Sequence, residues 1–220
     1  MKKYKLIIFD WDGTLMDSAA KIVACFQAAA RDLKLPVPKA SLVEIQIGLS
    51  LEKAWANILT QQEQAFDEAY LLRASERCRD YFLGMDQTPM PLYAGVEAGL
   101  TALNSAGYLL AVATGKVRRG LSHVLDETGL APYFVYTRCG DEAFSKPHPQ
   151  MVLDCLDFCG GEAQEAIVVG DTTYDMQMAK NAGVDSLAVS YGVYDASILR
   201  PLASMECVDD FKAVSQYFLI

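Results

Sequence analysis

The 220-residue chain is long enough to bury a substantial core, and its 52% hydrophobic and 21% charged residues are ordinary for a globular protein. Its formal net charge of −9 argues against a nucleic-acid-binding surface, which needs concentrated Lys and Arg. No apolar stretch reaches the roughly 18–20 residues that span a bilayer, and the N-terminus lacks the apolar region of a signal peptide. We therefore expect a cytoplasmic protein with neither a nucleic-acid nor a membrane partner.

The first strand is expected at 5–9, because an unbroken apolar run is typical of a buried strand. The segment FDWDGTLMDS at 9–18 then places Asp10 and Asp12 two residues apart at the carboxyl end of this strand. Two carboxylates so placed can divide one reaction, one attacking as a nucleophile while the other handles the proton. The alternative is a simple turn, because Asp and Gly suit turn backbones.

Residues 19–84 contain no convincing strand and are rich in Ala, Leu, Gln, Glu and Arg, which favour helices. Ser41 and Glu44 have the spacing of a capping box. A linker at 85–91 is expected to return the chain to the sheet. We predict helices over 19–34, 39–47, 51–59 and 62–83, with breaks at Pro36, Pro38, Gly48 and Gly84.

Apolar runs alternate with helix-compatible segments through the second half of the chain. This alternation predicts an α/β fold, a Rossmann-like parallel sheet with helices on both faces. Ligands of such sheets bind outside the carboxyl ends of the strands, where the candidate reactive residues lie. Strands are expected at 108–113, 133–136, 166–169 and 186–189, and helices at 94–106, 117–128, 149–159 and 174–182.

Thr114 and Gly115 follow the second expected strand. A hydroxyl at a strand end can hydrogen-bond a phosphate oxygen alongside backbone N–H groups, although Thr also simply ends strands and caps helices. The run TGKVRRGL at 114–121 lacks the full spacing of a nucleotide phosphate-binding loop, which disfavours ATP binding.

Charged residues also lie in two later loops. Lys146 belongs to SKPHP at 145–149, where prolines stiffen the loop and start the next helix, and by itself it would be an exposed lysine. His148 has no visible partner and is expected at the surface. Asp171 and Asp175 follow another strand and can either approach a metal ion or cap the following helix.

The spacing of the six cysteines does not indicate a metal site. Cys155 and Cys159 would share one helix face, but no second Cys or His pair completes a tetrahedral zinc site. Buried, reduced thiols are therefore expected rather than a structural zinc ion.

Four segments together resemble the four motifs of the haloacid dehalogenase superfamily, subfamily I: FDWDGTLMDS at 9–18, AVATG at 111–115, SKPHP at 145–149 and VVGDTTYD at 168–175. Members of this superfamily are mostly Mg²⁺-dependent phosphatases. The run that begins at Thr114 is similar to that of phosphoglycolate-phosphatase-like proteins. The resemblance implies that Asp10 attacks phosphorus to form a phosphoaspartate, while Asp12 protonates the leaving oxygen and later activates water. Dehalogenases generally lack the second Asp, so its presence favours phosphoryl chemistry.

The resemblance also assigns the ligand sites. It implies that Thr114 and Gly115 bind the substrate phosphate, and that Lys146 pairs with Asp10 and the transferring phosphoryl group. The implied Mg²⁺ ligands are Asp10, the backbone carbonyl of Asp12, Asp171 and, through water or from an outer position, Asp175. A divalent cation would offset the mutual repulsion of these carboxylates, and hard oxygen ligands suit Mg²⁺.

The helical segment between the first two strands resembles the cap of subfamily I. We expect a core domain at 1–17 and 89–220 and a helical cap at 18–88. A loop at 48–53 is expected to face the core. Substrate choice would come largely from the cap, where Ser50 and Lys53 are candidates, although a solvated surface suits Lys53 better.

The leading function is a phosphatase of a small phosphorylated metabolite such as phosphoglycolate. A phosphoglucomutase-like phosphoryl transferase shares all four motifs and stays open. A phosphonate hydrolase would need a Schiff-base lysine in the cap, for which Lys53 lies nearest a suitable place. A non-catalytic phosphometabolite-binding protein would be expected to lack Asp10 or Asp12, and both are present. Monomer and homodimer are both left open.

Overall fold

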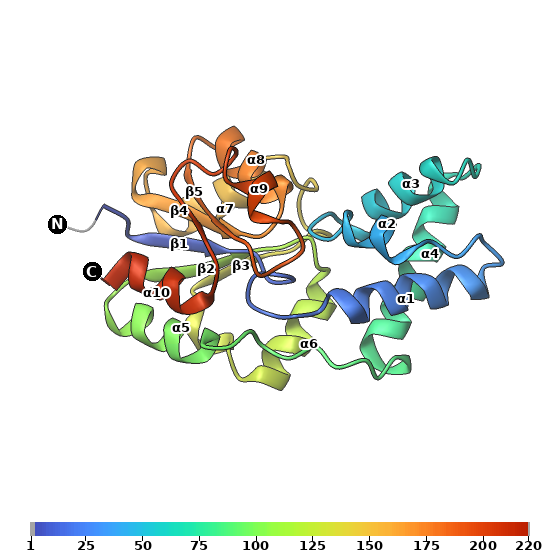
Figure 1. The fold of residues 1–220 in the computed structure, drawn as a ribbon, viewed down its shortest axis with the longest axis horizontal. Coiled ribbons are helices and arrows are strands. Elements are labelled where there is room, and N and C mark those ends of the chain that lie inside the picture. Colours follow the sequence, from blue (N-terminus) through green and yellow to red (C-terminus); the bar gives the residue numbers. More distant parts are fainter. Residues whose placement is uncertain (1–2, 220) are drawn as a thin grey trace.

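A six-stranded sheet forms the centre of the larger lobe of the computed structural model, which describes residues 3–219 (Figure 1). Every pairing is parallel, and the strands lie in the order β3-β2-β1-β4-β5-β6. The strands are β1 (Leu6–Phe9), β2 (Leu109–Ala113), β3 (Tyr136–Arg138), β4 (Ala166–Gly170), β5 (Asp185–Val189) and β6 (Cys207–Val208). The predicted α/β fold is thus confirmed.

The central strands are apolar throughout because helices cover both faces of the sheet. Along β1, Ile7 and Phe9 join the core on one face, while Leu6 and Ile8 join the core on the other. The first face packs against α5 (Val96–Ser105), α6 (Arg118–Thr128) and α10 (Phe211–Leu219), and the second against α7 (Gln150–Cys159) and α8 (Thr173–Asn181). A short helix, α9 (Ala196–Leu199), packs against β5.

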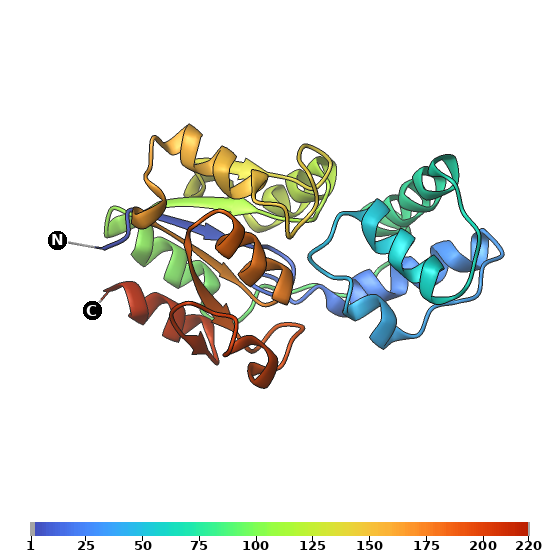
Figure 2. The same ribbon diagram turned by 90° about the horizontal axis from the view of Figure 1, so that it is seen from above.

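The second lobe is entirely helical and is inserted between β1 and β2 (Figure 2). Its own apolar core is centred on Phe26 and Trp55, whose rings stack with centroids 4.7 Å apart. The lobe consists of α1 (Ala19–Asp32), α2 (Ala40–Glu44), α3 (Leu51–Gln61), α4 (Glu68–Asp80) and a π-helical turn, η1 (Tyr81–Met85). We call these elements the helical lobe. None of the described helices is both long and apolar enough to cross a membrane.

Two chain segments connect the lobes and lie side by side. The Asp17 N–H donates to the Pro91 carbonyl at 2.8 Å, and the Tyr93 N–H donates to the Leu15 carbonyl at 3.0 Å. Lys21 adds a third tie, because its ammonium donates to the Asp86 carbonyl at 2.9 Å. The linker predicted at 85–91 therefore runs against the exit from the first strand.

Several predicted boundaries need correction. The strand expected at 133–136 is displaced: Ala131–Tyr133 form a 3-10 turn, and β3 begins only at Tyr136. Pro132 stands at the start of that turn, where its fixed φ is favourable. The apolar Phe134 belongs to a core cluster rather than to the strand.

The helical lobe shows two further differences. The helix expected over 62–83 begins only at Glu68, where the Asp67 carboxylate accepts the Tyr70 N–H at 2.7 Å and caps the helix, and it passes into η1 after Asp80. The capping box predicted at Ser41 is wrong, because Lys39 is the N-cap of α2 and Ser41 lies inside the helix. Strand β6 and helices α9 and α10 were not predicted, because these segments are short or lie beyond the last expected strand.

Candidate active site

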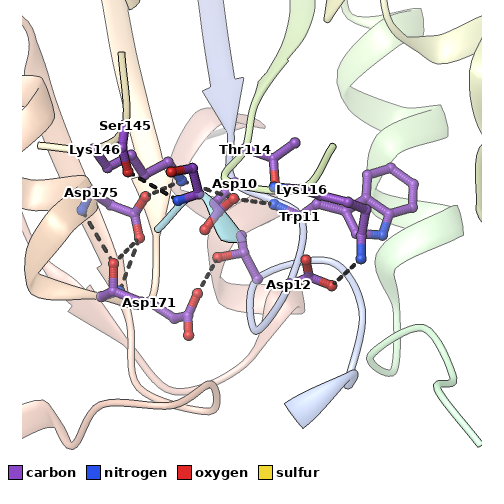
Figure 3. Close-up of polar contacts among 12 residues, drawn as sticks. Asp10, Trp11, Asp12, Thr114, Lys116, Ser145, Lys146, Asp171 and Asp175 are labelled. Carbon is purple, nitrogen blue, oxygen red and sulfur yellow. Dashed lines mark hydrogen bonds and ion pairs between the residues drawn. The ribbon is translucent and has the colours of Figure 1, made fainter. Parts of the chain in front are cut away.

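The residues singled out from the sequence meet at the carboxyl edge of the sheet. Asp10 follows β1, Thr114 follows β2 and Asp171 follows β4, and these three strands are neighbours. Lys146 arrives from the loop between β3 and α7. Figure 3 shows these side chains pointing toward one another. Parallel strands deliver their carboxyl ends to one edge, so residues far apart in sequence share one site.

The two oxygens of Asp10 have different surroundings. Its Oδ1 accepts the Trp11 N–H at 2.7 Å and the Lys146 ammonium at 2.9 Å. Its Oδ2 is buried and has no hydrogen-bond partner among residues 3–219. A buried carboxylate oxygen without a partner is costly, and such an atom in a native site points to a ligand or reactant.

Burial sets the electrostatics of this carboxylate. Desolvation raises the pKa of Asp10 above its usual range, and the adjacent Lys146 charge opposes that rise. For Lys146 the balance is reversed: burial by itself would lower its pKa, but the charges of Asp10 and Asp175 outweigh burial and raise it. The ammonium therefore stays protonated and favours the ionised form of Asp10.

Asp12 lies two residues after Asp10 in the loop that follows β1, and it is 6% exposed. Its Oδ1 accepts the Ser18 hydroxyl at 2.5 Å. The same oxygen faces the Lys116 ammonium at 3.0 Å (Figure 3). The Lys116 side chain is 6% exposed, and its ammonium lies 3.9 Å from the centroid of the Phe82 ring in η1. Neither Ser18 nor Lys116 was predicted as a site residue from the sequence. The available signal was position, because Lys116 lies just beyond β2, the neighbour of β1.

Asp171 is held rigidly beneath the loop that carries the first two aspartates. Its Oδ1 accepts the Thr14 hydroxyl at 2.8 Å, and its Oδ2 accepts the Val193 N–H at 2.9 Å. Gly13 has a φ of +85°, and a Cβ there would collide with this carboxylate. Position 13 therefore requires glycine for two reasons: the positive φ, and the lack of room for a Cβ beside Asp171.

Asp175 is committed to structural contacts on both oxygens. Its Oδ1 accepts the Lys146 ammonium at 2.7 Å, and its Oδ2 accepts the N–H and hydroxyl of Thr172 at 3.0 and 2.7 Å. Thr172 and Asp175 form the capping box of α8. Of the two alternatives for this residue, helix capping is therefore observed.

The carboxylate cluster suits a divalent cation. Ligand atoms of Asp10, Asp171 and Asp175 all lie within 4.8 Å of one another, and all three residues are buried. Like-charge repulsion adds to burial in raising the pKa of Asp171. With Asp12 the site has four carboxylates against the two ammonium groups of Lys116 and Lys146, so negative charge is in excess. The unpartnered Asp10 Oδ2 and the all-oxygen donor set fit Mg²⁺.

Thr114 and Gly115 occupy the remaining side of the site. Thr114 is 1% exposed and its hydroxyl oxygen accepts the Lys116 N–H at 3.2 Å, which leaves its own proton available for a ligand. A side chain at Gly115 would collide with the carbonyl oxygens of Gly48 and Leu49 in the helical lobe. Gly115 therefore allows close contact between the lobes.

Core side chains hold the loop between α2 and α3 over the site. The hydroxyls of Tyr174 and Tyr194 both donate to the Ile45 carbonyl at 3.1 Å, and the Ser50 N–H donates to the Ser145 hydroxyl at 3.0 Å. This loop faces the core as expected. Of the proposed cap contacts, Ser50 caps α3 through its hydroxyl, and Lys53 is exposed on that helix.

The other candidates lie apart from this site. His148 is exposed and its ring packs on Phe144. All six cysteines are free, Cys155 and Cys159 both lie on α7, and the aspartate cluster is the metal-binding group found among the described residues.

A doubly wound α/β fold thus carries a buried carboxylate centre at its carboxyl edge, where the ligands of such sheets bind. The model of the haloacid dehalogenase-like hydrolase family matches residues 7–189. The chain belongs to this family.

Curated and solved relatives agree with the assignment. The chain is 37% identical to the probable phosphatase IndB of Dickeya dadantii, over 95% of this chain and 91% of that protein. It is 33% identical to a phosphoglycolate phosphatase of Agrobacterium fabrum, over 96% and 90% of the two chains. A predicted phosphoglycolate phosphatase from Haemophilus somnus superposes with a TM-score of 0.86 at 26% identity, over 99% of each chain. The protein is therefore an enzyme of the phosphatase type.

Proposed function

We propose that the protein is a Mg²⁺-dependent phosphatase that hydrolyses a small phosphomonoester through a phosphoaspartate on Asp10. One observation carries this proposal: Asp10 Oδ2 is buried and has no partner within residues 3–219, while two donors fix Oδ1. A carboxylate held by one oxygen presents the other in a defined direction, which is the arrangement that an in-line attack on phosphorus needs.

Asp12 is proposed to move the proton. It would protonate the oxygen of the leaving alcohol as the Asp10–phosphorus bond forms, and would then accept a proton from the water that cleaves the phosphoaspartate. Its contacts with Ser18 and Lys116 support this role, because both fix the position of the carboxylate. The non-catalytic alternative has no support in a site where both aspartates are present and buried.

Three groups are proposed to bind the phosphoryl oxygens. They are the Thr114 hydroxyl, the Gly115 backbone N–H and the Lys146 ammonium, all of which donate hydrogen bonds to anions. Lys146 also offsets negative charge as the phosphoryl group is transferred. Asp175 is then a positioning residue, because it holds the ammonium at 2.7 Å.

The proposed Mg²⁺ ligands are the Asp10 carboxylate, the backbone carbonyl of Asp12 and Asp171, with Asp175 in an outer position. When bound, the ion supplies charge neutralisation for the phosphoryl group and for the carboxylates. The excess of negative charge and the free oxygen of Asp10 support its presence.

The substrate class follows from the relatives as a proposal. Phosphoglycolate is named for the Agrobacterium fabrum relative, so it is the first compound to test here. We also propose that 18–88 acts as a cap domain on a core formed by 1–17 and 89–220. A cytoplasmic location and a monomeric or homodimeric state remain predictions. Lys53, exposed and outside the site, gives no support to a phosphonate hydrolase.

Substitution of the nucleophile tests the proposal. Asp10→Asn is expected to lower the rate of phosphate release by at least about 10³-fold, because the amide cannot form the covalent intermediate. Release of inorganic phosphate from phosphoglycolate and other phosphomonoesters, with and without Mg²⁺, is the measurement. Asp126→Asn, at an exposed position on α6, is the matched control.

Folding and product identity complete the test. Circular dichroism should give similar spectra for Asp10→Asn and the control. Unchanged turnover in folded Asp10→Asn would refute the proposal. Return of the phosphoryl group to a second hydroxyl of the product, without release of phosphate, would instead indicate the phosphoglucomutase-like transferase.

A further inference from the structure

An apolar cavity opens directly beside Asp12 and extends into the helical lobe. Its walls come from α1, α2, α3, α4 and η1, and from the start of α6 on the core side. Asp12, Gly115 and Lys116 mark its end at the catalytic edge of the sheet. The mechanism above uses only this end, so the rest of the cavity has no assigned role.

Small side chains keep the cavity open inside the core of the helical lobe. Cys25, Ala54 and Cys78 line it and are at most 3% exposed, alongside larger apolar residues such as Phe26 and Phe82. An unfilled apolar cavity destabilises a protein in proportion to its volume. An apolar cavity with a few polar groups at one end is the usual form of a small-molecule site.

The polar groups on the walls are mostly already paired. Lys116 is neutralised by Asp12, and the side chain of Gln46 is bonded to Leu42 and Asn57. Arg79, half-buried on α4, is the lining cation for which the described residues provide no ion pair. A carboxylated leaving group would therefore find one uncommitted cation at one point of the cavity, whereas the remaining wall is apolar and can contact only an apolar group favourably.

We infer that the physiological substrate is a phosphomonoester whose alcohol carries an apolar body, and that this body binds in the cavity. This inference rests on the proposed function and narrows its substrate class. The phosphoryl group lies at Asp10, the ester oxygen lies beside Asp12 at the mouth of the cavity, and the hydrocarbon part extends between α1, α3 and α4. Phosphoglycolate, with its charged two-carbon body, leaves the cavity unfilled.

A series of straight-chain alkyl phosphates tests the inference, because their leaving groups differ in length and scarcely in chemistry. From ethyl to hexyl phosphate, kcat/KM for phosphate release is expected to rise by up to about fourfold for each added methylene group. Phosphoglycolate, which has the carbon number of ethyl phosphate, is expected to be a poorer substrate than hexyl phosphate.

A pair of variants on one helix locates the effect. Ala54→Leu fills the cavity and is expected to lower the hexyl-to-ethyl ratio of kcat/KM by about tenfold or more. Ala56→Leu makes the same change on α3 at a half-buried position outside the cavity lining, and should leave that ratio unchanged. Thermal unfolding of both variants checks that they fold.

Binding of alkylphosphonates, which cannot be hydrolysed, provides a readout that does not need turnover. Titration calorimetry with Mg²⁺ present should give affinities that increase from ethyl- to hexylphosphonate in the native chain and not in Ala54→Leu. If no phosphomonoester is hydrolysed but the phosphonate affinity increases with alkyl chain length, the proposed function is wrong. The cavity would then still be the binding site of the alkyl group.

The inference is overturned by either of two results. One is hydrolysis of alkyl phosphates with a kcat/KM and a phosphonate affinity that do not increase with chain length. That result would leave the phosphatase proposal intact. The other is a preference for phosphoglycolate over every alkyl phosphate, lost in Arg79→Gln, which would make the cavity a carboxylate site.

Discussion

At the scale of single residues, the ion pair between Lys116 and Asp12 connects the proposed proton donor to the helical lobe. Both side chains are less than 10% exposed, and the Lys116 ammonium also lies over the Phe82 ring. A buried charge pair contributes little net stability, but removal of one partner leaves an uncompensated buried charge. The pair therefore holds Asp12 in place rather than adding stability.

This arrangement predicts non-additive mutations. Lys116→Met should lower the free energy of unfolding by about 3 kcal/mol, because it removes the cation that faces the buried Asp12 carboxylate. The double variant Lys116→Met with Asp12→Asn should recover at least about 1 kcal/mol of that loss. Urea unfolding of the native chain, both single variants and the double variant gives the coupling energy. Additive free energies would show that the pair is not coupled.

At the scale of elements, side chains fix two loops to one another at the carboxyl edge of the sheet. The start of α6 is joined to the loop after β3 through Arg118, whose guanidinium makes two 2.8 Å bonds to Glu142. The same guanidinium donates to the hydroxyl and carbonyl of Thr137 in β3. These contacts hold the loop of Thr114 beside the loop of Lys146.

The Arg118–Glu142 contact predicts a pH dependence of stability. The pKa of Glu142 is lowered in the folded protein, chiefly by its hydrogen bonds to Arg118. The stabilisation is therefore present above the unfolded-state pKa, near 4.5, and is lost as the pH falls through the lower folded-state pKa. Glu142→Gln should cost about 1 kcal/mol at pH 7, since the pair is partly solvent-screened, and this cost should disappear as the pH falls through the folded-state pKa of Glu142.

Denaturant unfolding at several pH values measures this difference. Glu76→Gln, at an exposed position on α4, is the control and should show no pH-dependent cost. An equal cost of Glu142→Gln at pH 7 and at low pH would contradict the electrostatic explanation.

The loop between α2 and α3 predicts a second effect at this scale. The Ile45 carbonyl accepts two tyrosine hydroxyls, and removal of both by Tyr174→Phe with Tyr194→Phe takes away the donors that fix the helical lobe on the core. About 1 kcal/mol for each of the two bonds implies an increase in KM of up to about 30-fold. Steady-state kinetics provide the measurement.

The control for this variant is Tyr133→Phe. Its hydroxyl contacts Thr101, away from the interface between the lobes. Tyr133→Phe is expected to leave KM unchanged. An equal increase in KM in Tyr133→Phe, or an unchanged KM in the double variant, would show that the two bonds to Ile45 do not position the helical lobe.

At the scale of the whole molecule, the site is assembled from both halves of the chain, so a bound cation should stabilise the entire fold. At a Mg²⁺ concentration of 100 Kd the stabilisation is about 2.7 kcal/mol. For a chain of this length that corresponds to an increase in Tm of roughly 5–10 °C. Thermal unfolding in EDTA and in excess Mg²⁺ measures the shift.

Asp171→Asn should remove this Mg²⁺-dependent shift, because it replaces a carboxylate of the buried cluster by a neutral amide. Asp126→Asn should retain it. A shift of equal size in Asp171→Asn would place the cation elsewhere in the molecule.

The sequence by itself determined the central strands of the sheet, most of the helices that cover it and the meeting of Asp10, Thr114 and Asp171. Strand and helix periodicities are local, and parallel strands necessarily bring their carboxyl ends to one edge. For the same reason most helix boundaries were predicted to within about two residues, with exceptions such as α4, where Asp67 provides the cap.

The tertiary structure alone decided how each polar group is used. Only the packed molecule pairs Lys116 with Asp12, commits Asp175 to Lys146 and Thr172, and leaves Asp10 Oδ2 free. Only the seating of the helical lobe on the core forms the apolar cavity. These features depend on contacts between residues distant in sequence and on space left between elements, and no local pattern of amino acids encodes either.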